Sequence, residues 1–134
     1  MAATPRCYYY ADGQQVWLDR EADVDSARLA TASRGGSEAL PAMLPAYSAQ
    51  GAQMVALPEV RVEDADEAAL ARVAAWLARE PAAGEVLASR PGRLVLRPGA
   101  ALQGDSVALA REAVERCGVA SASPRFVRIS KKPA

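Results

Sequence analysis

The side chains that most often carry out catalysis are rare in this sequence. Its 134 residues contain no histidine, which is the commonest general base and a frequent metal ligand. Nucleophiles that depend on a neighbouring imidazole are therefore excluded. A serine–lysine pair would have to use Lys131 or Lys132, because the sequence has no other lysine and both stand beside its C-terminal end. We expect a protein without catalytic activity.

Carboxylates gather at two places where they resemble a catalytic or metal-binding pattern. The two groups are Glu63, Asp64, Asp66 and Glu67, and the alternating Asp19, Glu21, Asp23 and Asp25. The first group opens a predicted helix, where acidic side chains suit the helix dipole and need only solvent. The second resembles a calcium loop but lacks the central glycine and the closing glutamate of an EF-hand. We interpret residues 19–25 as a solvated connector.

Cofactor and metal motifs are also missing from the sequence. Cys7 and Cys117 are too few for a disulfide framework or a zinc site, and we interpret them as buried or bystander thiols. The segment 33–36 reads Ser-Arg-Gly-Gly and lacks the Lys-Ser/Thr ending of a phosphate-binding loop. No metal and no cofactor are expected.

The composition describes one globular domain rather than a disordered chain or a membrane protein. Hydrophobic residues make up 51% of a chain whose length suits a single domain, 1–134. The 16 basic residues balance 16 acidic ones, which argues against a nucleic-acid partner. No apolar run is long enough to cross a bilayer, and residues 1–6 lack the apolar core of a signal peptide. We therefore expect no membrane partner and a cytoplasmic location.

The N-terminal part of the chain predicts a β-hairpin over residues 7–18. Two runs of strand-forming residues flank Asp12-Gly13, a strong hairpin signal. In such a strand Tyr8 and Tyr10 lie on one face and Tyr9 on the other. Two readings remain open: a hairpin packed through its aromatic side chains, and a platform that binds a partner.

The rest of the chain predicts helices and strands in alternation. We expect strands at 26–31 and from Gln53 to Leu57, the latter continuing through Val62, and a helix from Glu38 to Gln50. Clearer helices run from Asp66 to Arg79 and from Asp105 to Cys117, because their apolar residues recur at helical spacing. The candidate caps are Asp64 or Asp66 for the first helix and Asp105 or Ser106 for the second. Between them lie short strands at 85–88 and 94–96 around a Pro-Gly turn.

The chain closes with a strand-like stretch from Gly118 to Ser130 and a basic tail. Gly118 suits the end of a helix because glycine adopts positive φ without strain. Pro124 cannot donate to a strand ladder, so it marks an edge, a bulge or a bend. An extended end of this kind can lie along another protein.

Together these elements predict an α+β fold. We expect a ferredoxin-like sandwich over 26–130, a mostly antiparallel sheet with helices on one face, preceded by the hairpin and followed by a tail at 131–134.

Two stretches of the sequence resemble propeptides of subtilisin-like serine proteases. The aromatic hairpin Tyr8–Leu18, followed by Asp25–Leu29, is similar to the opening of those precursors. The stretch Leu109–Arg128 is similar to the propeptide end, where a helix leads into a Gly-Val and then a Pro-Asn-aromatic-Val strand. Arg125 stands where asparagine is usual.

The resemblance implies a ferredoxin-like domain that inhibits a protease. In that family the sheet packs on two protease helices and the C-terminal tail enters the active-site cleft. It implies a stand-alone inhibitor of a separate serine protease, with contacts from Pro124, Arg125, Phe126, Val127, Arg128, Ile129, Ser130, Lys131 and Lys132.

Two further hypotheses follow from the sequence. The first, an alternative function, is an adaptor domain in bacterial signalling or defence that binds another signalling protein through the surface of Tyr8 and Tyr10. The second concerns control of an inhibitor: cleavage between Arg34 and Gly35, in an exposed polar segment, would switch it off.

Overall fold

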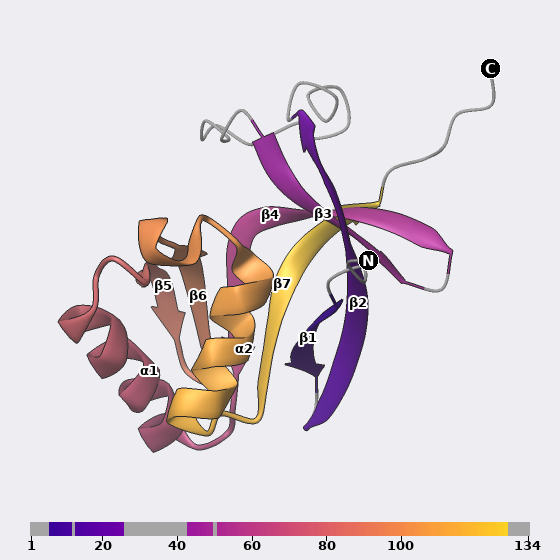
Figure 1. Cartoon of the computed structure of the whole chain (residues 1–134). Coiled ribbons are helices and arrows are strands. Elements are labelled where there is room, and N and C mark those ends of the chain that lie inside the picture. Colours follow the sequence, from indigo (N-terminus) through magenta and orange to yellow (C-terminus); the bar gives the residue numbers. More distant parts are fainter. Residues whose placement is uncertain (1–5, 12, 26–42, 50, 129–134) are drawn as a thin grey trace.

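The computed structural model describes residues 6–11, 13–25, 43–49 and 51–128, which form an α+β fold. The predicted class, with a mostly antiparallel sheet, is confirmed, and the strand pairings within the described residues are antiparallel. The elements are β1 (Arg6–Ala11), β2 (Gln14–Asp25), β3 (Met43–Ala49), β4 (Ala52–Glu63), α1 (Glu67–Arg79), β5 (Gly84–Arg90), β6 (Arg93–Pro98), the 3-10 helix η2 (Ala100–Leu102), α2 (Ser106–Cys117) and β7 (Ser121–Arg128) (Figure 1).

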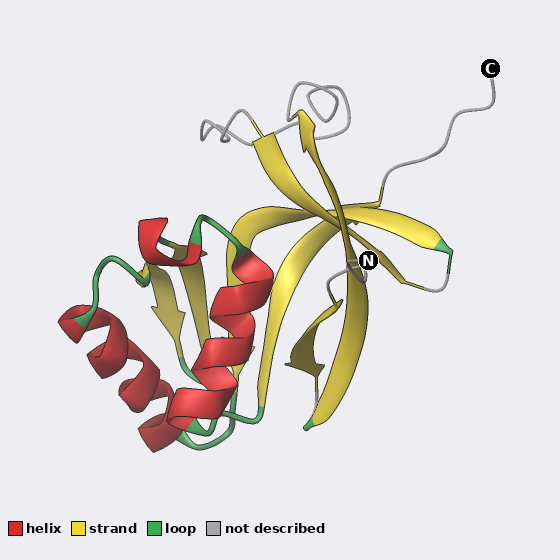
Figure 2. Cartoon of the chain, in the orientation of Figure 1, coloured by secondary structure: helices red, strands yellow, loops and turns green. Residues whose placement is uncertain are grey.

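The seven strands lie in the order β3-β2-β1-β7-β4-β6-β5, and β3 also pairs with β4. This extra pairing closes β1, β2, β3, β4 and β7 into a ring, which we call the five-strand ring. The other part of the sheet, β7-β4-β6-β5, stays open and carries both α-helices on one side (Figure 2). Because β4 and β7 run through both parts, they join the ring to the helix-covered sheet.

The predicted hairpin is confirmed, and its second strand is longer than expected. Ala11 pairs with Gln14 across a two-residue turn in which Gly13 has a φ of 80°, a conformation that favours glycine. The interpretation of 19–25 as a connector is wrong, because β2 continues to Asp25 and pairs with β3. The two-residue alternation of carboxylates was the signature of a strand, in which alternate side chains share a face.

The predicted helix from Glu38 to Gln50 is wrong over its described part, because Met43–Ala49 is strand β3. Pro45 disfavours a helix interior, since it lacks the backbone N–H and its ring clashes with the preceding turn. In β3 it lies opposite a register shift in β2, between Glu21 and Val24, where the ladder is already interrupted. Residues 38–42 and the predicted strand at 26–31 lie outside the described residues.

The two predicted helices are confirmed, and each begins at a capping aspartate. The side chain of Asp66 accepts a hydrogen bond from the Ala68 N–H, and that of Asp105 accepts one from Val107. Gly118 ends α2 with a φ of 73°, as expected for a helix C-cap. Neither helix in the described part of the chain is long and apolar enough to cross a membrane.

The predicted strands around 53–62, 85–88 and 94–96 are confirmed within β4, β5 and β6. β7 pairs with β4 along most of its length, and their register shifts between Ala56 and Val60. Pro124 faces Val60 at this irregularity, so of the three alternatives expected at Pro124, an edge, a bulge or a bend, the pairing fits a bulge.

Three hydrophobic clusters hold these layers together. The largest lies between the helices and the sheet, with Val73 of α1, Leu96 of β6 and Leu109 of α2 fully buried. The second draws on every strand of the five-strand ring and on the first turn of α2, and Tyr47 is its largest fully buried side chain. The third contains Val24, Leu44, Ala46, Val55 and Leu57, which alternate along β3 and β4 with residues of the second. Both faces of β3 and of the first half of β4, up to Leu57, therefore contribute to cores.

Candidate functional site

The residues predicted to enter a protease cleft begin within the protein's own sheet. Pro124 to Arg128 belong to β7 and pair with β4. The ring centroid of Phe126 lies 5.9 Å from that of Tyr9 and 6.4 Å from that of Tyr47, inside the second cluster. Val127 packs against the third cluster. Phe126 and Val127 thus hold the protein's own core together.

The remaining members of that set point to solvent or lie beyond the described residues. Arg125 and Arg128 are exposed, and Arg125 pairs with Glu59 at 3.3 Å. Ile129, Ser130, Lys131 and Lys132 lie outside the described residues, as do Arg34 and Gly35 of the cleavage hypothesis.

Tyr8, Tyr10 and Trp17 form a surface cluster on the outer face of the hairpin, which we call the aromatic patch. Tyr8 pairs with Trp17 across the two strands, and their ring centroids are 4.7 Å apart. Tyr10 meets Tyr8 edge to face at 5.7 Å. Trp17 is 46% exposed, which is unusual for the largest apolar side chain. Exposed aromatic clusters of this kind are enriched at protein interfaces.

Helix α2 fixes the orientation of the aromatic patch. The hydroxyls of Tyr8 and Tyr10 both donate to Glu115 Oε2, at 2.6 and 3.1 Å, and the Arg111 guanidinium lies 5.4 Å from the Tyr8 ring centroid. The hydrogen bond to Glu115 is the main reason that the pKa of Tyr8 rises to about 12. Tyr8 therefore stays a neutral donor at physiological pH, held by a carboxylate.

The two predicted contact sets do not form one surface. Tyr8 and Tyr10 lie on the outer face of β1, whereas Tyr9 turns inward and packs with Phe126. A partner that contacts the aromatic patch therefore does not touch Phe126.

The open face of the helix-covered sheet is lined by cross-strand ion pairs. Its charged residues alternate along the strands with core residues such as Val62 and Leu96. The pairs are Glu63 with Arg93 at 3.4 Å, Glu85 with Arg97 at 3.5 Å, and Glu59 with Arg125 at 3.3 Å. Arg61 lies among them and is exposed. This face is suited to a polar partner surface of mixed charge.

A buried polar contact inside the five-strand ring is another feature that the sequence did not reveal. The Tyr47 hydroxyl donates to Asp105 Oδ2 at 2.6 Å, and the Arg20 guanidinium lies 5.2 Å from the Tyr47 ring centroid. Burial and the neighbouring Asp105 raise the pKa of Tyr47. The contact ties the ring to the start of α2.

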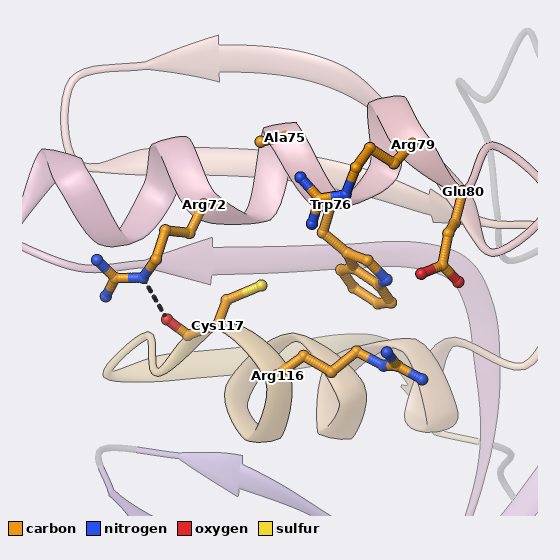
Figure 3. A pocket seen from close by; sticks show the side chains of 7 residues that line it. All are labelled: Arg72, Ala75, Trp76, Arg79, Glu80, Arg116 and Cys117. Carbon is orange, nitrogen blue, oxygen red and sulfur yellow. Dashed lines mark hydrogen bonds between the residues drawn. The ribbon is translucent and has the colours of Figure 1, made fainter.

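A third feature is a pocket between the two α-helices, lined by the side chains of Arg72, Ala75, Trp76, Arg79, Glu80, Arg116 and Cys117 (Figure 3). The spacing of Arg72, Trp76 and Arg79 along α1 places them on one side of that helix. This spacing was the signal in the sequence, but the contribution of Arg116 depends on how the helices pack.

No group of three or more possible metal ligands occurs within the described ranges. Cys7 and Cys117 are free and belong to different core clusters, and burial raises the pKa of both thiols. Burial therefore disfavours their thiolate forms.

Comparison with protein-family models, with curated proteins and with solved structures found no match for this chain.

Proposed function

We propose that this protein is a non-catalytic regulator that binds a separate serine protease in the manner of a subtilase propeptide. We infer that residues 52–128 form a ferredoxin-like unit. The supporting observation is the succession β4-α1-β5-β6-α2-β7, with the strands in the spatial order β7-β4-β6-β5. This is the split β-α-β arrangement that the resemblance to propeptides implies.

The proposed contact uses the open sheet face and the chain that follows β7. Because β7 is fixed by β4 up to Arg128, the segment that enters the cleft is Ile129 to Lys132, rather than the whole stretch from Pro124. Main-chain hydrogen bonds to the cleft edge would supply affinity, and the ion-paired face around Arg61 would meet the protease helices.

The decisive experiment compares the full chain with a variant that ends at Arg128. Both are added to a purified subtilisin-like protease, and cleavage of a chromogenic peptide is measured. We expect the full chain to inhibit, and removal of 129–134 to weaken inhibition by about tenfold or more, equivalent to about 1.4 kcal/mol. The truncation leaves β7 intact, so circular dichroism should be unchanged.

An absence of inhibition by the full chain, or equal inhibition by both chains, contradicts the proposal. Arg61→Glu is a second test, because it reverses one exposed charge on the open face without touching the core. It should weaken inhibition if that face meets the protease.

A second candidate function, an adaptor domain, is favoured by the aromatic patch. Trp17 remains 46% exposed although Tyr8 stacks against it. Trp17→Ala should then abolish capture of a partner from a lysate, while the neighbouring Gln14→Ala and the truncation at Arg128 should not. Capture that depends on residues 129–134, and not on Trp17, favours the protease regulator.

A further inference from the structure

The pocket between α1 and α2 has the composition of an anion-binding site. It has a volume of about 350 Å³ and opens between the second half of α1 and the last turn of α2. Figure 3 shows side chains from both helices around it. The pocket lies on the helix layer, on the opposite side of the sheet from the proposed protease contact.

Positive charge dominates the lining of this pocket. Arg72, Arg79 and Arg116 contribute guanidinium groups, against the single carboxylate of Glu80. Arginine stays protonated at any physiological pH, so this excess is permanent. Within the described residues Arg79 makes no ion pair, whereas Arg116 pairs with Glu112 of its own helix. At least one guanidinium therefore lacks a counter-charge.

Arg72 is held in place by the end of α2. Its Nε donates to the Cys117 carbonyl oxygen at 2.9 Å, which satisfies a C-terminal helix carbonyl (Figure 3). The terminal nitrogens of the same guanidinium remain available for a second acceptor. A guanidinium fixed by one hydrogen bond loses less entropy when it binds an anion.

Trp76 supplies an independent observation that points to a polar ligand. Its side chain is only 4% exposed, and its indole Nε1 is buried without a hydrogen-bond partner in the described part of the chain. Buried donors of this kind are rare because they forfeit their hydrogen bond to water. Figure 3 shows the indole nitrogen on the side of the ring toward Glu80 and the Arg116 guanidinium, which lies 5.4 Å from the ring centroid.

We propose that this pocket binds a phosphate monoester, with the guanidinium groups of Arg79 and Arg116 beside its oxygens, the Trp76 indole N–H as a further donor, and Arg72 adding positive charge at the other end of the pocket. Phosphate offers three acceptor oxygens and close to two negative charges, which suit a pocket with several arginine donors. A carboxylate carries one charge and is satisfied by a single guanidinium. The indole N–H is buried beside Glu80 and Arg116. If the bound phosphate displaces one of these side chains, a phosphate oxygen can accept the indole hydrogen bond.

The test follows the indole N–H of Trp76 by nitrogen-15 NMR. The chain has two tryptophans, so Trp17→Phe leaves one indole signal and assigns it. Inorganic phosphate and phosphoserine are titrated separately at constant ionic strength, with chloride and serine as controls. We expect a saturable shift with a millimolar or lower dissociation constant for at least one phosphate probe. Tighter binding of phosphoserine assigns the site to a phosphorylated molecule, equal binding means that the phosphate group alone is recognised, and tighter binding of inorganic phosphate contradicts the monoester.

Substitutions of opposite charge in the pocket should change the affinity for phosphate in opposite directions. Arg79→Gln and Arg116→Gln should each weaken binding by about tenfold, the loss of one charge-assisted hydrogen bond. Glu80→Gln should strengthen it, because it removes the opposing charge. Arg61→Gln removes the same charge from the far side of the sheet and should leave affinity unchanged. The proposal is overturned if neither phosphate probe gives a saturable shift, if chloride gives the same shift, or if Arg61→Gln weakens binding as much as Arg79→Gln.

Discussion

At the scale of single residues, Tyr47 carries the most consequential polar contact. Its side chain is fully buried, and its hydroxyl donates to the carboxylate of Asp105. The same carboxylate caps α2 through its other oxygen, which accepts from the Val107 N–H at 2.9 Å. One side chain of the ring and one turn of a helix thus share a single acidic group.

Tyr47→Phe should lower the free energy of unfolding by about 1.5–3 kcal/mol, because it removes a buried hydrogen bond to a charged acceptor. Tyr10→Phe is the matched control. It deletes a hydroxyl that donates to Glu115 at an exposed site, and should cost about 0.5 kcal/mol or less. Urea denaturation of the three proteins measures both values. Equal costs for the two substitutions would mean that Tyr47 contributes through its ring alone.

The raised pKa of Tyr47 also predicts how stability depends on pH. In the unfolded chain tyrosine loses its proton near pH 10. The native Tyr47 keeps its proton to higher pH. Its contribution to the free energy of unfolding is therefore fully present below about pH 10 and is lost as the pH rises above that value. Urea denaturation from pH 8 to 11 should show that the free energy of unfolding falls more steeply with pH in the wild type than in Tyr47→Phe. The difference in slope should correspond to the release of up to about one extra proton on unfolding. Parallel curves would contradict this.

Sequence reasoning could place some of these residues and not others. The shared face of Tyr8 and Tyr10 follows from the period of a strand alone. The contact between Tyr47 and Asp105 spans two elements far apart in the chain, and Tyr47 was assigned to a helix. No local pattern indicates which strand residue will meet a helix cap.

At the scale of elements, the two helix caps are similar in sequence and differ in their contacts. Asp66 caps α1 at an exposed position, whereas Asp105 caps α2 and also accepts from Tyr47. Asp66→Ala should cost about 1 kcal/mol, a typical value for an N-cap. Asp105→Ala should cost about 2–3 kcal/mol, since it removes the cap and leaves the buried Tyr47 hydroxyl without its acceptor.

A double-mutant cycle separates these two contributions. In the background of Tyr47→Phe, Asp105→Ala should cost no more than Asp66→Ala does in the wild type, because only the cap remains to be lost. Additive effects of Tyr47→Phe and Asp105→Ala would show that the two side chains stabilise the fold independently.

The elements that were predicted correctly are those that signals within their own segment of sequence determine. The helices α1 and α2 follow from an aspartate cap, an apolar stripe and a closing Pro or Gly, all within one segment. Strand β3 was missed because its conformation depends on pairing with β2 and β4, and the segment around Pro45 and Tyr47 does not by itself indicate that pairing. The outer half of β2 was missed because its alternating carboxylates were compared with a calcium loop, and because the register shift between Glu21 and Val24 interrupts the strand pattern of its apolar residues.

At the scale of the whole molecule, strand order is the property that sequence reasoning could not reach. The closure of the five-strand ring depends on the pairing of β3 with β4 and of β1 with β7, and β1 and β7 are separated by nearly the whole chain. Such contacts depend on which edges remain free after local hairpins form. The α+β class could be predicted, but the ring could not.

Because β4 and β7 belong to both the ring and the helix-covered sheet, we expect the two parts to unfold as one unit. The two tryptophans report on them separately: Trp17 lies on β2 in the ring, and Trp76 lies on α1 against the helix-side core. Trp76→Phe and Trp17→Phe each leave one reporter. In urea, fluorescence of each variant should coincide with its own circular dichroism transition, as two-state unfolding requires. A ring that melts before the helices would give Trp17 fluorescence an earlier midpoint than circular dichroism, and would show that the bulge near Pro124 uncouples the two halves of β4 rather than joining them.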